Sequence, residues 1–163
     1  MDIFNVSKLD TINQMKIEEE IRQNPFKDGY AKAFVNLLFS QSYLVTRQSK
    51  IFKPHDLSPE QYNVLRILRG QFPNPTTVSS IQERMLNKMS NASRLVEKLK
   101  QKGMLKRSAC PKDRRQVDIV ITKKGLALLE LLDIEVKNFN IDTIHLDEKE
   151  VEQLNILLDK LRG

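Results

Sequence analysis

The pattern of apolar and polar residues predicts a mainly helical chain whose clearest element is an amphipathic helix between Met89 and Gly103. Apolar residues recur there at i, i+3, i+4 and i+7, the spacing that puts side chains on one helix face. They are Ala92, Leu95, Val96 and Leu99. Ser90 can cap the first turn, and Gly103 can end the helix in a left-handed conformation. The opposite face carries side chains that can contact bases or phosphates: Asn91, Arg94, Lys98 and Lys102.

A β-hairpin is predicted directly after this helix, from Leu105 to Thr122. Apolar residues at 117, 119 and 121 alternate with Gln116 and Asp118, as in a half-buried strand. The tip, residues 111–115, reads Pro-Lys-Asp-Arg-Arg and gathers three cations in five residues, which suggests a nearby anion. A Lys-rich helix face alone is most often a solvated surface. A basic helix followed by a basic-tipped hairpin is instead typical of a winged helix-turn-helix, a DNA-binding unit.

Two further helices are predicted before this region. Residues 7–23 form a weak helix candidate that Asn24-Pro25 would end, because the residue before proline disfavours the helical conformation. A long helix is expected from about Asp28 to Phe52. Its apolar surface is broader than one thin domain can cover, which indicates packing against another subunit. Residues 53–56 are interpreted as a linker.

Capping patterns mark the next elements. Ser58 and Gln61 form a capping box with Pro59 at the first helical position, flanked by a hydrophobic staple at positions 57 and 62. Thr76 or Thr77 opens a short helix, and residues 86–88 form the turn before the basic helix. Residues 77–103 therefore have the spacing of a helix-turn-helix.

The C-terminal part is predicted to hold two helices. Thr122 can cap a helix from Lys123 to about Asn138. Asp147 and Glu150 form a second capping box, which opens a helix that runs to the C-terminus. The apolar positions of that last helix make a seam: Val151, Leu154, Leu158 and Leu161.

The charge distribution supports the same region as a binding surface. The 163 residues carry a net charge of +6. Residues 76–125 hold 13 basic and 4 acidic residues, a balance of +9, whereas the rest hold 14 basic and 17 acidic, a balance of −3. A positive field concentrated on one region is the electrostatic footprint expected of a DNA-binding protein.

Other chemistries find little support. One cysteine, Cys110, excludes an intrachain disulfide, and with only two histidines beside it a classical zinc site is improbable. No phosphate loop, dinucleotide turn or catalytic pairing is evident, so we expect neither enzymatic activity nor a cofactor. The N-terminus lacks a signal pattern and no strictly apolar run exceeds four residues, which predicts a cytoplasmic protein without membrane association.

A family resemblance follows from these motifs. The segment Leu57-Ser-Pro-Glu-Gln-Tyr-Asn-Val-Leu65, the helix-turn-helix, Asp113-Arg-Arg115, and Ile121-Thr122 with Gly125 resemble the MarR family of bacterial transcription regulators. The match extends in element order over about residues 28–161. It is most specific in the wing, where an Asp-x-Arg tip precedes a Leu-Thr-x-x-Gly pattern that has Ile in the Leu position. The resemblance implies a homodimer that binds palindromic double-stranded DNA under small-molecule or redox control.

The resemblance also assigns domains and residues. Residues 1–27 would form an N-terminal extension, residues 28–56 and 123–163 the dimerisation helices, and residues 57–122 the DNA-binding domain. Residues placed like the family's major-groove contacts are Ser90, Asn91, Ser93 and Arg94, with Lys98 on the same face. Thr77 would contact a phosphate.

At the wing, Arg115 would enter the minor groove, whose width and potential favour a guanidinium. Asp113 is either its partner or an ordinary turn residue, and Lys112 and Arg114 would contact phosphates, which position the protein without specifying sequence. Cys110 is interpreted as a small strand residue rather than a redox switch.

Two alternatives differ in their sequence requirements. A winged helix used only for protein–protein assembly would present an apolar or acidic recognition face, whereas this face is basic. RNA binding would require exposed aromatic residues that stack on bases, and aromatic residues make up only 6% of the chain. We therefore predict a DNA-binding transcription regulator, a repressor released by a small aromatic or anionic effector.

Overall fold

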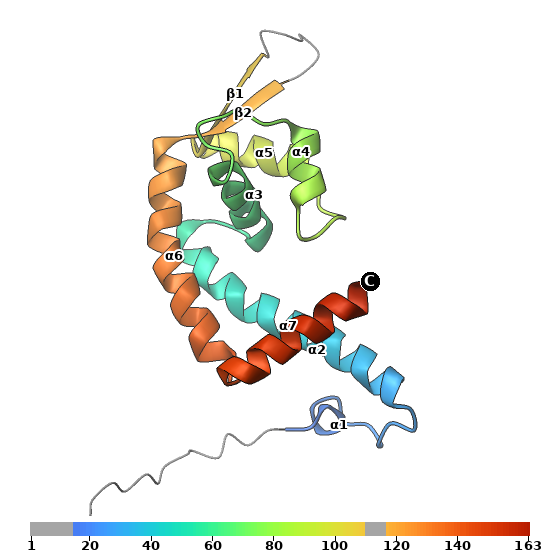
Figure 1. The fold of residues 1–163 in the computed structure, drawn as a ribbon. Helices are drawn as coiled ribbons and strands as arrows, with labels where there is room; N and C mark the ends of the chain where they lie inside the picture. The colour runs from blue at the N-terminus through green and yellow to red at the C-terminus, as the bar shows by residue number, and fades with distance from the viewer. Residues whose placement is uncertain (1–14, 110–116) are drawn as a thin grey trace, which may run out of the picture. The chain divides into compact units, whose positions relative to one another are not determined.

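The computed structural model describes residues 15–109 and 117–163 (Figure 1). The elements are α1 (Ile17–Glu20), α2 (Gly29–Phe52), a 3₁₀ turn (Lys53–His55), α3 (Pro59–Arg69), α4 (Val78–Arg84), α5 (Ala92–Gln101), β1 (Leu105–Ala109), β2 (Val117–Ile121), α6 (Lys123–Thr143) and α7 (Glu148–Arg162). The fold is mainly helical with a two-stranded wing, as predicted. The chain divides into two compact units, residues 1–43 and 44–163.

In the first unit, the prediction of a helix over residues 7–23 is wrong for its described part. The chain is helical only over Ile17–Glu20, and the backbone turns at Arg22 with a φ of 52°. The positive φ of Arg22 ends this helix after one turn, and Asn24-Pro25 follows it, where a helical conformation is disfavoured. Residues 7–14 lie outside the described residues.

The two helical segments of this unit are joined by one ion pair. Lys32 Nζ lies 2.8 Å from Glu18 Oε1, and this hydrogen bond lowers the pKa of Glu18 below its ordinary value. Asp28 opens α2 by accepting hydrogen bonds from the amides of Tyr30 and Ala31. The long helix predicted from residue 28 is thereby confirmed.

The second unit is organised around one hydrophobic core built from α3, α4, α5, the hairpin and the first half of α6. Phe52, at the end of α2, stacks on Tyr62 of α3 with ring centroids 4.5 Å apart. Leu129 and Leu132 of α6 are fully buried in the same core. The core thus includes residues on both sides of the segment 57–122, and the division of the chain into functional domains stays a prediction.

Helix starts in this unit follow the capping patterns of the sequence. Ser58 Oγ accepts from the Gln61 amide at 3.2 Å, and Gln61 Oε1 accepts from the Ser58 amide at 3.0 Å. Thr122 caps α6 and Asp147 caps α7, both as predicted. The predicted end of α6 at about Asn138 is wrong, because no Gly or Pro interrupts residues 138–143 and the helix continues to Thr143.

The expected linker at residues 53–56 is also more ordered than predicted. It forms a 3₁₀ turn that ends at Asp56 with a φ of 52°. No helix among the residues that the structure describes is long and apolar enough to cross a membrane.

The hairpin pairs antiparallel strands from Leu105 opposite Ile121 to Ala109 opposite Val117. Ile119 and Ile121 are buried, as the alternation predicted. Thr76, just before α4, exchanges two backbone hydrogen bonds with Ile119 at 2.9 and 3.0 Å. The wing is therefore attached to the start of the helix-turn-helix as well as to its end.

The backbone segments at the junction between the wing and α6 lie very close together. Thr122 donates its hydroxyl to the Gly103 carbonyl at 2.8 Å, donates its amide to the Met104 carbonyl at 3.0 Å and accepts the Gly125 amide at 3.2 Å. A Cβ on Gly125 would lie 2.5 Å from the Met104 carbonyl oxygen. Only glycine lets α6 approach the backbone between α5 and β1 this closely.

We predict that Gly125→Ala destabilises the protein by about 1–3 kcal/mol, the usual cost of overpacking a close contact. Gly70→Ala is the matched control, because a Cβ there meets nothing nearer than 3.6 Å and its φ of −66° suits alanine. Urea unfolding followed by circular dichroism measures both. Equal midpoints for the two variants would contradict the close approach at Gly125.

Candidate nucleic-acid interface

The helix-turn-helix is formed by α4 and α5, with a turn between them that is longer than the predicted residues 86–88. Thr77 caps α4, since its Oγ1 accepts the Ser80 amide at 3.2 Å. The predicted cap of α5 at Ser90 is wrong. Asn91 is the N-cap, because its Oδ1 accepts the Arg94 amide at 2.9 Å, while Ser90 belongs to the turn and donates its amide to the Asn87 carbonyl.

Two amide side chains that were not predicted as functional hold this turn. Gln82 of α4 donates from Nε2 to the Lys88 carbonyl at 2.9 Å and accepts the Ala92 amide on Oε1 at 3.1 Å. Asn63 of α3 accepts the Leu86 amide on Oδ1 at 2.9 Å. Their only signal in the sequence is a polar residue next to predicted core positions, which is too common to identify such a role.

The predicted recognition face of α5 is largely open. Ser93, Arg94 and Lys98 are exposed, and Ser90 is half-buried. Arg94 and Lys98 form no ion pair with any residue that the structure describes. With Ser90 and Asn91 they line a hollow of about 360 Å³ whose other wall, at the start of α3, includes Ser58 and Glu60. These positions bring two free cations and several hydrogen-bonding groups together on one surface.

Lys102 does not belong to this open face, contrary to the sequence analysis. Its Nζ lies 3.0 Å from Asp56 Oδ2 and 3.5 Å from Gln61 Oε1, and it also donates to the Asp56 carbonyl. The end of α5 is thereby attached to the 3₁₀ turn and to α3.

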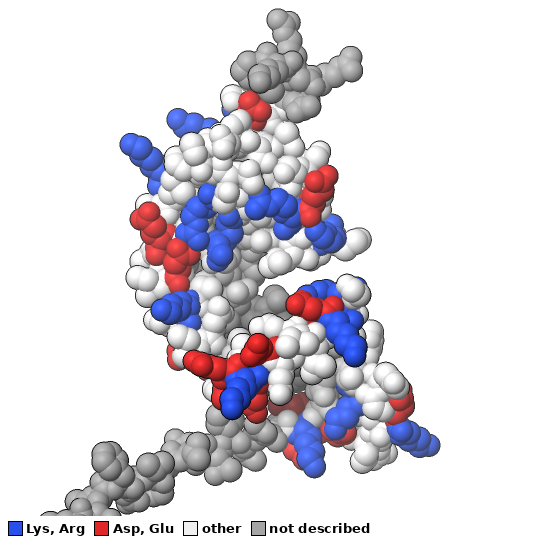
Figure 2. Space-filling view, viewed as in Figure 1, with Lys and Arg blue, Asp and Glu red and all other residues white. Residues whose placement is uncertain are grey.

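An ion pair also links α5 to the wing. Arg107 of β1 lies 2.9 Å from Glu97, while Lys106 is exposed. The predicted wing-tip contacts Lys112, Asp113, Arg114 and Arg115, together with Cys110, lie outside the described residues. Figure 2 shows Lys and Arg side chains gathered over the part of the unit that holds α3 to α5, with acidic side chains at the margins.

A further ion pair connects two helices that pack in the core, α3 and α6. Arg69 of α3 donates two hydrogen bonds to the Asp133 carboxylate of α6, at 2.7 and 3.0 Å. The Arg69 guanidinium lowers the pKa of Asp133, and the carboxylate raises the pKa of Arg69. Both groups therefore remain charged near neutral pH, where the protein would bind DNA.

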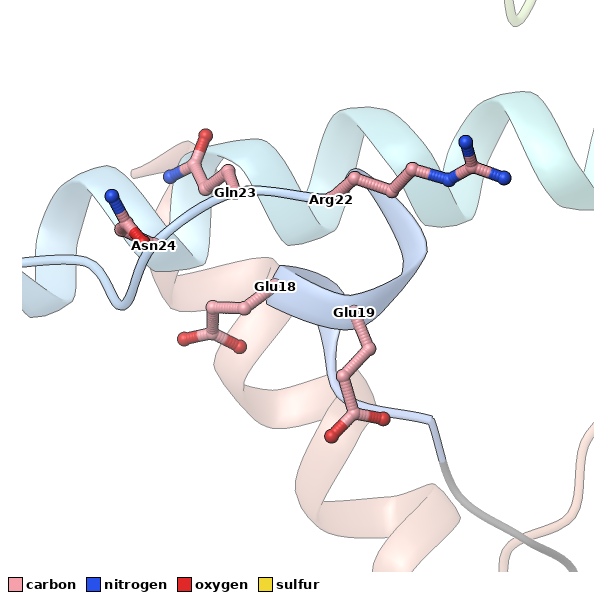
Figure 3. Close-up of a pocket in the computed structure, with 5 residues that line it drawn as sticks. All are labelled: Glu18, Glu19, Arg22, Gln23 and Asn24. Carbon is pink, nitrogen blue, oxygen red and sulfur yellow. The ribbon is translucent and has the colours of Figure 1, made fainter.

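Other hollows offer less. A hollow of about 540 Å³ in the first unit is lined by Glu18, Glu19, Arg22, Gln23 and Asn24. Their side chains point in different directions, with the two carboxylates away from the Arg22 guanidinium (Figure 3). Within the described part of the chain, no group of three or more His, Cys, Asp or Glu side chains could hold a metal ion.

The arrangement as a whole is that of a winged helix-turn-helix. A three-helix core places α5 with an exposed cationic side, and an antiparallel hairpin follows it directly. A family model for the MarR family matches residues 57–117. This segment covers α3, α4, α5 and β1.

Known proteins agree with this assignment. The uncharacterised regulator YkoM of Bacillus subtilis is 30% identical over 109 residues, 66% of this chain and 70% of YkoM. Two solved structures share the fold: Bordetella bronchiseptica BpsR, whose DNA binding is regulated by 6-hydroxynicotinic acid (22% identity, TM-score 0.72, covering 86% of this chain and 99% of BpsR), and a DNA complex of MepR from S. aureus (20% identity, TM-score 0.71, covering 84% and 97%). The chain belongs to the MarR family and is a DNA-binding transcription regulator, not an enzyme.

The corrected cap generates a prediction. Asn91→Ala should destabilise the protein by about 1 kcal/mol, the usual cost of losing an N-cap side chain. Ser90→Ala is the control and should leave the free energy of unfolding nearly unchanged, since no described hydrogen bond uses its hydroxyl. Urea unfolding of the two variants distinguishes the positions, and a larger loss for Ser90→Ala would restore Ser90 as the cap.

Proposed function

We propose that this regulator is a cytoplasmic repressor that binds a palindromic operator as a homodimer and is released by a small aromatic anion. The observation that carries the DNA-contact assignment is the unpaired cationic side of α5. Arg94 and Lys98 are exposed there beside Ser93, and they have no carboxylate partner among the described residues. A protein keeps free cations together on one helix face at an electrostatic cost that phosphates can offset.

Each predicted contact has a definite place in this proposal. Arg94 and Ser93 would meet base edges in the major groove, because the N-terminal end of a recognition helix enters it. Asn91 uses its Oδ1 as the cap, so its Nδ2 is the group left for DNA. Lys98, Ser90 and Thr77 would contact phosphates. The wing-tip contacts of Lys112, Asp113, Arg114 and Arg115 rest on the family resemblance.

The homodimer is supported by apolar surface that this chain leaves uncovered. The described side chains of α7 include none that is buried, although the helix is amphipathic. Leu157 and Leu161 are 62% and 64% exposed, and α2 exposes Tyr30 and Phe34. Exposed apolar side chains of this kind on an amphipathic helix are typical of an interaction surface. We propose that residues 28–56 and 123–163 pair with the same residues of a second copy. The α5 helices of the two copies would then face the two half-sites of the operator.

The effector class is supported by a hollow of about 320 Å³ between α3 and α6. Its lining includes Tyr62, Lys137, the Asp133 carboxylate that is paired with Arg69, and Arg66, whose guanidinium donates to the Tyr62 hydroxyl at 2.9 Å. A guanidinium beside an aromatic ring suits an aromatic carboxylate. The regulation of BpsR by 6-hydroxynicotinic acid is consistent with such a ligand.

We predict that DNA affinity falls steeply and linearly on a log–log plot against salt concentration, because several phosphates are neutralised in each dimer.

Arg94→Ala should relax the preference for particular bases at some half-site positions by about 1–3 kcal/mol, the worth of a bidentate base contact. Lys27→Ala, at an exposed position outside both proposed interfaces, removes the same charge and is the control. The measurements are binding-site selection from a random library and fluorescence anisotropy at several salt concentrations.

A nearly flat salt dependence would favour the alternative of a protein-assembly module. A site preference that is identical for wild type and Arg94→Ala would remove Arg94 from the reading face while leaving DNA binding itself intact.

The dimer is tested on α7. Leu157→Glu should weaken self-association by about tenfold or more, because it places a charge in an apolar interface. Asn155→Glu adds the same charge at an exposed polar position and should have little effect. Sedimentation at micromolar concentration measures the assembly, with circular dichroism to confirm folding. A folded wild-type monomer under these conditions would contradict the dimer.

A further inference from the structure

The turn between α4 and α5 presents two large apolar side chains to solvent. Leu86 is 87% exposed and Met89 is 93% exposed, whereas Met85, which begins the turn, is 1% exposed. Met85 anchors the turn in the core, so the fold has no need of apolar side chains at 86 and 89. Polar residues there would avoid exposing hydrocarbon to water.

This turn is held in one conformation rather than being loose. Gln82 binds it at the Lys88 carbonyl and the Ala92 amide, and Asn63 binds the Leu86 amide. Within the turn, Asn87 Oδ1 accepts the Met89 amide at 3.0 Å. Met89 is therefore projected from a fixed backbone, as a contact residue must be if it is to bind at little entropic cost.

Its surroundings identify the kind of partner. Residues 84–102 hold six basic and one acidic residue, so Met89 lies within a strongly positive segment. An apolar protein surface would gain little from that field, whereas DNA offers phosphates to the cations and an apolar group to the methionine. The 5-methyl group of thymine is the apolar group that bases present in the major groove. Methionine, with its flexible thioether, adapts readily to such a contact.

We propose that Met89 is a specificity-determining residue that reads a thymine methyl group at the edge of each half-site. Met89 lies two residues before Asn91, the N-cap of α5, so it enters the major groove with the helix end that carries Arg94. The inference rests on the proposed function, because it requires α5 to lie in the groove. It adds an apolar element to a reading surface otherwise made of cations and polar groups.

The experiment is a double-mutant cycle between one side chain and one methyl group. The operator is taken from a random-library selection with the full-length protein. Its thymines are then replaced one at a time by deoxyuridine, which removes only the 5-methyl group. Affinities of wild type, Met89→Ala and Leu86→Ala are measured by fluorescence anisotropy at one salt concentration. Leu86→Ala is the matched control, since it truncates an equally exposed apolar residue of the same turn.

At one thymine of the half-site, deoxyuridine should weaken wild-type binding by about fourfold, the worth of one buried methyl. Met89→Ala should bind thymine and deoxyuridine at that position equally well, and Leu86→Ala should respond as wild type does. Thermal unfolding of Met89→Ala should match wild type, because the side chain is exposed.

Three results would overturn the inference: no thymine in the selected half-site, the same response of wild type and Met89→Ala to every deoxyuridine, or coupling to Leu86 without coupling to Met89. Each presupposes that the wild type selects DNA. Failure of the wild type to select any DNA would instead defeat the proposed function itself.

Discussion

The fold of the second unit, residues 44–163, depends on one close approach between two backbone segments, at Gly125 and at Met104. The first turn of α6 lies so near the Met104 carbonyl that Gly125 has no room for a side chain. Thr122 fixes the approach with hydrogen bonds to the Gly103 and Met104 carbonyls and to the Gly125 amide. Because the end of α5, both ends of the wing and the start of α6 meet here, this junction sets where the wing stands relative to the recognition helix.

Two kinds of contact stabilise the rest of this unit. Apolar side chains fill the core between α3, α4, α5 and α6, and this burial provides most of the stabilisation. Polar contacts at the margin then fix details that burial alone leaves free, because hydrophobic packing is not directional. Lys102 attaches the end of α5 to Asp56 and Gln61, and Arg107 attaches the wing to Glu97. Arg94 and Lys98 of α5 have no such partner among the residues that the structure describes.

Local patterns predicted most of this architecture. The capping boxes at Ser58 and Asp147 and the cap at Thr122 are local hydrogen-bond patterns, so the residues that form them lie within three positions of each other. The cap of α5 was misassigned because Ser90 and Asn91 are both good caps, and the choice is made by Gln82, which binds the turn from another helix. Lys102 was misplaced for the same reason, since Asp56 is distant in sequence. Contacts between elements leave no periodic signal in one chain.

The double use of the Gln82 side chain has a consequence for the ageing of the protein. Its amide nitrogen donates to the Lys88 carbonyl while its oxygen accepts from the Ala92 amide, so neither half of the group is spare. Deamidation would exchange that nitrogen for a carboxylate oxygen, which cannot donate and would face a carbonyl of like polarity. The oxygen that remains would still accept the Ala92 amide, and Asn63 would still accept the Leu86 amide, so the turn would lose one of its contacts. Deamidation of Gln82 would therefore weaken the attachment of the start of α5 to α4 without any change in the volume of the side chain.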